Sequence, residues 1–248
     1  ICPGRHGPLN MVGGLLNSCN FFFADLGHRL SMDAEGNYVP SLGLDKLHKY
    51  AAMFGLDHKS GVEIDELEPQ ISDIDPERSA MGQGNHAYTN VQLSRYVAAI
   101  ASRGNVFELS LLDKITDSEG NLIKDYTPEI SSHIDAADST WDTVQQGMRE
   151  VIASGTAKKL FADLEVPIAG KTGTAQEAKN KPNHAFFISY APYNNPEICV
   201  TVNIPYGYSA SNAANIAKSV YQYYYGEIDL ESILNAGARD AANVTIRD

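Results

Sequence analysis

The sequence of 248 residues lacks any apolar run near the ~20 residues that a membrane-spanning helix requires. It is also short of positive charge, since 19 Lys and Arg stand against 31 Asp and Glu and the formal net charge is −12. Phosphate binding needs clustered Lys and Arg, so this balance disfavours nucleic acid as a partner. An acidic chain of ordinary globular composition suits a small-molecule or peptide substrate better.

Cysteine is scarce as well. The three cysteines (Cys2, Cys19, Cys199) have neither the spacing of a zinc site nor that of a CxxC redox pair. Their odd number argues against a disulfide scaffold, so we interpret them as buried or incidental thiols. The histidines form no H-E-x-x-H motif, and we expect neither a metal nor another cofactor.

The N-terminal residues Ile1 to Arg5 show neither an initiating Met nor a charged-then-apolar signal pattern. We therefore expect the chain to be part of a longer protein. There is no internal repeat, low-complexity segment or linker. One domain over residues 1–226, followed by a tail over 227–248, is predicted.

Helices are predicted first along the chain. Apolar residues recur at helical spacing over 8–16, 21–30 and 45–54, whereas 61–84 is predicted to be mostly loop. Thr89 is predicted to cap a helix that runs to Ser102. Residues 139–142 have the form of a capping box, which would open a helix ended by Gly155.

Strands are predicted mainly in the last third. A β-hairpin is expected over 111–126, turning at 118–121, and three strands over 166–176, 185–191 and 198–204. Their short links predict antiparallel pairing. A final helix over about 211–225 would pack through Ala213, Ala217, Val220 and Tyr224. The pattern predicts an α+β fold, a helical part plus a small antiparallel sheet with a C-terminal packing helix.

The string Gly170-Lys171-Thr172-Gly173-Thr174-Ala175-Gln176 is the most informative motif. A phosphate-binding P-loop would need a glycine where this sequence has Glu165, and a carboxylate there would repel phosphate. The nucleotide-binding interpretation therefore fails. The K-T-G motif of penicillin-reactive serine acyltransferases fits instead, and a plain buried strand is the alternative.

Each residue of this motif has chemistry that suits a substrate carboxylate. Thr172 and Thr174 carry hydroxyls that can donate hydrogen bonds to it, and Lys171 adds positive charge. Gly173 lacks a side chain, so a substrate backbone could approach the strand closely.

A second motif, Ser18-Cys19-Asn20, precedes the first in the sequence. In a turn between two helices, the hydroxyl of Ser18 could relay a proton and the amide of Asn20 could orient a substrate carbonyl. The alternative is an ordinary helix cap, for which Ser and Asn are common.

Together these elements resemble the transpeptidase domain of class B penicillin-binding proteins. The resemblance begins with His6–Asn10, which leads into the S-x-N segment. It continues with Met81–Gly84, followed by Thr89, Gln92 and Leu93. It ends with Gln146–Thr156, the K-T-G segment and His184–Pro192. It spans nearly the whole chain to Gly226. It implies an incomplete penicillin-binding transpeptidase, or serine β-lactamase-like, fold.

The family's first motif, S-x-x-K, is missing, because no serine in this chain is followed three positions later by lysine. The resemblance places that motif, with the nucleophilic serine, N-terminal to S-x-N. We therefore expect it upstream of Ile1 and expect this chain alone to be inactive, less stable than the full domain, or self-associating through exposed apolar surface.

The resemblance implies a peptidoglycan D,D-transpeptidase at the extracytoplasmic cell surface, anchored by an upstream segment. Its partners would be D-Ala-D-Ala stem peptides and β-lactam antibiotics. Ser18, Asn20 and Lys171 would be catalytic, and Thr172, Gly173, Thr174 and Gln176 would bind substrate. A non-catalytic module that senses peptidoglycan or β-lactams is the alternative. A β-lactamase ranks lower, because Glu231–Asn235 follows the K-T-G motif instead of preceding it.

Overall fold

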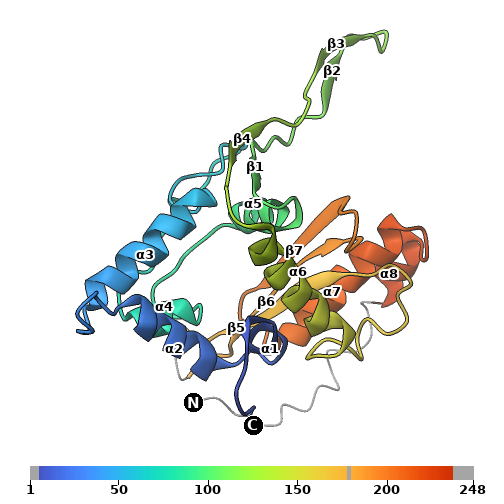
Figure 1. Cartoon of the computed structure of the whole chain (residues 1–248). Helices are drawn as coiled ribbons and strands as arrows, with labels where there is room; N and C mark the ends of the chain where they lie inside the picture. The colour runs from blue at the N-terminus through green and yellow to red at the C-terminus, as the bar shows by residue number, and fades with distance from the viewer. Residues whose placement is uncertain (1–5, 178–179, 237–248) are drawn as a thin grey trace.

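The structure, a computed structural model, describes residues 6–177 and 180–236. Cys2 and residues 237–248 of the predicted tail lie outside the described residues. Figure 1 shows the elements in chain order. They are α1 (Met11–Leu16), α2 (Asn20–Leu30), α3 (Pro40–Met53), α4 (Pro76–Ala80), α5 (Asn90–Ala101), β1 (Asn105–Phe107), β2 (Lys114–Thr116), β3 (Leu122–Asp125), β4 (Ile130–His133), α6 (Asp138–Ala153), β5 (Ala169–Ala175), β6 (His184–Ala191), β7 (Ile198–Ile204), α7 (Ala210–Tyr224) and α8 (Leu230–Ala236).

The centre of the fold is an antiparallel sheet in the order β5-β6-β7, as the short links predict. Helices α5 and α6 pack on it from one side and α7 from the other (Figure 1). Apolar residues fill both layers: Val97, Met148 and Tyr190 belong to one buried cluster, and Phe187 and Tyr221 to another. The α+β architecture predicted from the sequence is confirmed.

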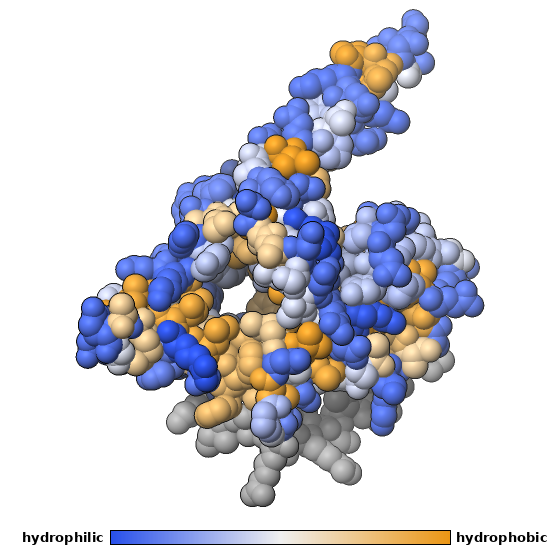
Figure 2. Space-filling view, viewed as in Figure 1, coloured by the Kyte–Doolittle hydropathy of each residue, from blue (hydrophilic) through white to orange (hydrophobic). Residues whose placement is uncertain are grey.

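A second group consists of α2, α3 and α4, which pack against one another. Glycine permits this close approach, because a Cβ on Gly27 would lie 2.5 Å from the carbonyl oxygen of Pro76. Figure 2 shows the surface hollowed between this group and the helices on the sheet, with apolar residues along part of the border.

The predicted hairpin is present as β2 and β3, and it projects away from the body (Figure 1). Its turn is held by Asp117, whose carboxylate accepts hydrogen bonds from the backbone N–H groups of Glu119 and Asn121. At its base a second, unpredicted ladder joins β1 to β4. These strands are too short for periodicity to distinguish them from loop.

Several predicted boundaries are wrong for local reasons. Helix α1 begins only at Met11, because Asn10 caps it, and α3 begins earlier than predicted, at Pro40, a residue suited to a first helical position. Helix α4 interrupts the predicted loop. Strand β5 begins at Ala169 instead of 166, after Pro167, which has no N–H to donate to a sheet.

The predicted capping box at 139–142 is also wrong. Helix α6 begins at Asp138, its N-cap is Ala137, and no side chain caps it. The guanidinium of Arg103 instead bonds the carboxylate of Asp138 at 3.0 Å, so a tertiary contact fixes this end. By contrast, Thr89 and Gln92 form a complete capping box at α5, which confirms the cap predicted there.

The predicted inner face of the last helix is partly wrong. Ala213 and Ala217 are buried as expected, but Val220 and Tyr224 are 38% and 51% exposed. Tyr221 is the buried tyrosine, and its hydroxyl donates to Ser189 Oγ at 2.8 Å. The buried face thus keeps Ala213 and Ala217 but turns toward Ala214 and Tyr221. Helix α8 carries Glu231, which is exposed.

None of the described helices is both long and apolar enough to cross a membrane. The predicted division of the chain at residue 226 stays a prediction. Gly226 does follow the end of α7 with a positive φ of 75°, a conformation that favours glycine.

Candidate active site

The K-T-G motif lies on β5, an edge strand of the sheet. Lys171 is paired in register with Ile188 of β6, and Gly173 with Phe186. Within the described residues, no strand pairs with the opposite edge of β5. Its outer backbone groups can therefore accept an added peptide strand.

The S-x-N motif forms the turn between α1 and α2. Ser18 has a positive φ of 47°, a conformation that costs energy for a residue with a side chain. Hydrogen bonds from the backbone N–H groups of Ser18 and Cys19 to the carbonyls of Leu15 and Gly14 hold the turn. The N-cap of α2 is Cys19, without a side-chain cap, so the helix-cap interpretation of Ser18 and Asn20 is wrong.

The two motifs meet through a hydrogen bond from Lys171 Nζ to Ser18 Oγ. Lys171 also donates to the carbonyl oxygen of Thr172 at 2.6 Å. Because Ser18 accepts from the lysine, its own O–H remains available to donate to a further group. A lysine that is hydrogen-bonded to a hydroxyl can pass a proton through it.

Burial lowers the pKa of Lys171 to about 8 from its usual 10.5. Removal from water disfavours the charged ammonium, and no carboxylate is paired with this lysine in the described chain. The pKa therefore approaches the range in which a side chain can both accept and donate a proton near neutral pH.

Next to this pair, the hydroxyl of Thr172 lies 3.2 Å from that of Thr156. Thr156 follows Gly155 directly after α6, and sequence reasoning gave it no role of its own. The only signal was its position at the end of the Gln146–Thr156 stretch that carries part of the resemblance. Only the packing of α6 against β5 brings the two threonines together.

The remaining predicted site residues are accessible. Asn20, Thr174 and Gln176 are exposed, Asn20 at the start of α2 and the other two at or beyond the end of β5. A Cβ on Gly173 would lie 3.3 Å from Phe186 Cβ, so a side chain there would crowd the neighbouring strand. Gly173 thus serves sheet packing as well as an open approach to the strand.

Two motifs from opposite halves of the chain therefore converge on one lysine–serine pair beside an open strand edge. The model of the penicillin binding protein transpeptidase domain matches residues 3–222. The chain belongs to this family. The resemblance inferred from the sequence is confirmed.

Relatives and solved structures agree with the family. The chain is 30% identical over 225 residues to the peptidoglycan D,D-transpeptidase MrdA of Haemophilus influenzae, a match that covers 75% of this chain and 34% of the relative. It is 28% identical over 233 residues to penicillin-binding protein 2A of Bacillus subtilis, covering 82% of this chain and 31% of that protein. The chain spans about a third of the length of these curated relatives.

Among solved structures, the fold is similar to penicillin-binding protein 2 of Pseudomonas aeruginosa, with a TM-score of 0.73, 29% identity and coverage of 90% of this chain and 51% of that one. Penicillin-binding protein 2B of Streptococcus pneumoniae gives a TM-score of 0.75 at 25% identity, covering 88% of this chain and 39% of that one. The chain is thus a partial transpeptidase domain.

Proposed function

We propose that this chain supplies the S-x-N and K-T-G walls of a peptidoglycan D,D-transpeptidase site. The hydrogen bond between Lys171 and Ser18 carries the proposal, because it unites two distant motifs around a proton-transfer pair. The nucleophile would be the serine of an S-x-x-K motif, which this chain does not contain.

The proposed reaction is an acyl transfer in two steps. The serine oxygen attacks the carbonyl carbon of the penultimate D-Ala, an ester forms, and the amide bond breaks to release the terminal D-Ala. An amine of a neighbouring stem peptide then attacks the ester. A new amide forms as the ester C–O bond breaks, and a proton from the attacking amine passes to the serine oxygen.

In this scheme Lys171 and Ser18 pass the proton from the nucleophile to the leaving amine. Asn20 would orient the substrate amide, and the backbone N–H of Thr174 would donate to the oxyanion. The hydroxyls of Thr172 and Thr174 would bind the terminal carboxylate. The open edge of β5, up to Gln176, would pair with the stem peptide.

The substrates would be D-Ala-D-Ala stem peptides, and β-lactams would acylate the same serine. The family description supports penicillin binding, and the MrdA relative supports the transpeptidase reaction. A solved relative of Mycobacterium tuberculosis forms an acyl-enzyme with imipenem. We propose that the protein acts at the extracytoplasmic surface, held by an anchor in an upstream segment.

Labelling with a fluorescent penicillin tests the proposal. This chain would be compared with one extended N-terminally through the next ~100 residues, and with the same extended chain after serine-to-alanine substitution in its S-x-x-K motif. Labelling of the extended chain alone, abolished by the substitution, is expected.

Two results would contradict the proposal. Labelling of the short chain would make one of its own serines, such as Ser18, the nucleophile. An upstream sequence without S-x-x-K, in a protein that still binds peptidoglycan or β-lactam reversibly, would support the non-catalytic sensing module instead.

A further inference from the structure

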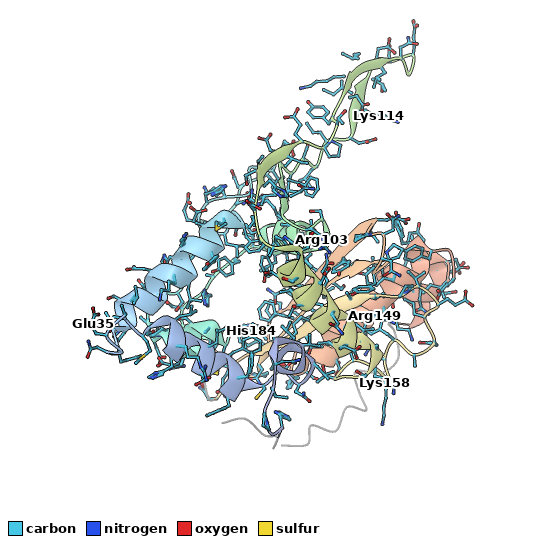
Figure 3. All side chains as sticks on the ribbon, in the orientation of Figure 1. Glu35, Arg103, Lys114, Arg149, Lys158 and His184 are labelled. Carbon is cyan, nitrogen blue, oxygen red and sulfur yellow. The ribbon has the colours of Figure 1, made fainter. Side chains whose placement is uncertain are left out.

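Beyond the motif residues, four side chains gather where β5 ends and β6 begins. We call Glu177, Lys181, His184 and Tyr206 the strand-end cluster. Glu177 directly follows Gln176, His184 is the first residue of β6 and is labelled in Figure 3, and Tyr206 lies just beyond the end of β7. The cluster thus joins three separate segments at one end of the sheet.

The tyrosine hydroxyl is the centre of the cluster. Tyr206 Oη donates to Glu177 Oε2 at 2.7 Å and accepts from Lys181 Nζ at 3.0 Å. Lys181 Nζ also donates to Glu177 Oε1 at 2.9 Å, which closes a ring of three hydrogen bonds. Each polar group in the ring therefore binds another, as expected of a clamp and not of a ligand site.

Tyr206 also holds the start of β6. Its backbone N–H donates to His184 Nδ1 at 3.2 Å, and its ring lies 4.8 Å from the imidazole. Because Nδ1 accepts, the ring proton of the neutral histidine is on Nε2, which lies 3.3 Å from Glu177 Oε2. The carboxylate of Glu177 thus receives bonds from both segments that flank the end of β5.

The carboxylate of Glu177 is ionised at neutral pH. The hydrogen bonds from Lys181 first, and then from Tyr206, lower the pKa of Glu177 to about 2. Each exposed ion pair of this kind contributes little by itself to global stability. A closed ring of bonds nevertheless restricts the chain locally, because several contacts must open together.

The ring of hydrogen bonds restricts the chain just beyond the end of β5, the strand that carries the K-T-G motif. Ladder pairing between β5 and β6 ends at Ala175 and His184, so the sheet itself does not hold Gln176 or Glu177. The backbone of Tyr206 adopts a positive φ of 54°, a strained conformation that the surrounding bonds must maintain.

We propose that Tyr206 is a positioning residue, which through Glu177 keeps the outer edge of β5 from Thr174 to Gln176 aligned to pair with a substrate peptide. This inference rests on the proposed function. Without the clamp, the end of the edge strand would sample splayed conformations. Peptide binding would then have to order it, at a cost in affinity.

The test uses this chain and its Tyr206→Phe variant, which keeps the ring and the backbone bond to His184 but loses both hydroxyl bonds. Tyr223→Phe is the matched control, because Tyr223 lies on α7 and is 52% exposed. The first measurement is hydrogen exchange of the amides at the end of the β5–β6 ladder, residues 173–175 and 184–186, in the free chain. We expect exchange about 5- to 10-fold faster in Tyr206→Phe, and no change in Tyr223→Phe.

The second measurement is binding of diacetyl-L-Lys-D-Ala-D-Ala, followed through the amide resonances of Thr174 to Gln176. The expected Kd is about 5- to 10-fold higher for Tyr206→Phe, with the melting temperature unchanged. A Glu177→Gln variant keeps the hydrogen-bond acceptor but loses the charge. Its Kd should lie between that of the original chain and that of Tyr206→Phe.

The outcomes separate this inference from the proposed function. Unchanged exchange, or an unchanged Kd, in Tyr206→Phe would overturn the positioning role. A lower melting temperature with unchanged Kd would likewise reduce Tyr206 to a structural role. Failure of all variants to bind the peptide would contradict the proposed function, and the peptide-aligning role with it, even if exchange still revealed the clamp.

Discussion

Lys171 and Ser18 are 153 positions apart in the sequence and are joined by a hydrogen bond from the lysine Nζ to the serine Oγ. The serine comes from a strained turn between two helices, and the lysine from an edge strand. This contact joins the two motifs at one point, and the first prediction below rests on it.

Replacing Lys171 by alanine in an extended chain that labels with penicillin should slow acylation by roughly 10²- to 10⁴-fold, the usual contribution of a positioned acid–base group. The rate is measured with excess fluorescent penicillin. Lys158→Ala, at an exposed position after α6, is the control and should acylate at the normal rate. Normal acylation by the Lys171 variant would remove this lysine from the mechanism.

Stability should rise with pH between about 8 and 10.5. Folding lowers the pKa of Lys171 from 10.5 to about 8, so in this window the unfolded chain holds a proton that the folded chain has released. Below the window the folded state carries the cost of a buried ammonium, and this cost disappears as pH rises. Urea unfolding at about pH 7.5 and about pH 9.5 measures the effect, which Lys171→Met should abolish. If the free energy of unfolding rises equally with pH in the variant and in the original chain, other groups cause the pH dependence.

Thr172→Val should weaken recognition of a substrate carboxylate. Loss of one hydroxyl hydrogen bond to a charged group is expected to reduce kcat/KM about tenfold or more in the extended chain. The matched comparison is a substrate whose C-terminal carboxylate is replaced by an amide. For this substrate, Thr172→Val should reduce kcat/KM much less. Equal losses for both substrates would indicate a packing role, for example through Thr156.

Two tyrosines of α7 provide a paired test of the core. Tyr221 is fully buried and bonded to Ser189, whereas Tyr224 is 51% exposed. Tyr221→Ala should lower the free energy of unfolding by about 3–5 kcal/mol, and Tyr224→Ala by less than about 1 kcal/mol. Chemical denaturation of both variants measures the difference. The reverse order would restore the helix face predicted from the sequence.

The chain extended through S-x-x-K should melt at a higher temperature than the present chain. The hollow in Figure 2 is bordered in part by apolar residues, and Phe21 at the start of α2 is 74% exposed. Covering such surface stabilises the folded state, at roughly 25 cal/mol per Å². Calorimetry compares the two chains, and sedimentation tests whether the shorter one self-associates to cover this surface. A longer chain that melts no higher would refute the expectation.

The sequence by itself determined the family, the main elements and the motifs. Residues 198–204 form the strand predicted between short links, and Thr89 with Gln92 forms its own cap, so local chemistry was sufficient at these places. The motif spacing around Lys171 excluded the nucleotide-binding alternative from the sequence alone.

Only the tertiary structure decided how these pieces act together. Ser18 and Asn20 have the composition of a helix cap, and the contact with Lys171 shows that Ser18 has a different partner. Tyr221 and Tyr224 are both plausible core residues on a helix, and packing against the sheet selected Tyr221. Thr156 and the strand-end cluster could not be predicted, because hydrogen bonds between distant segments depend on where folding places the backbone and not on local propensity.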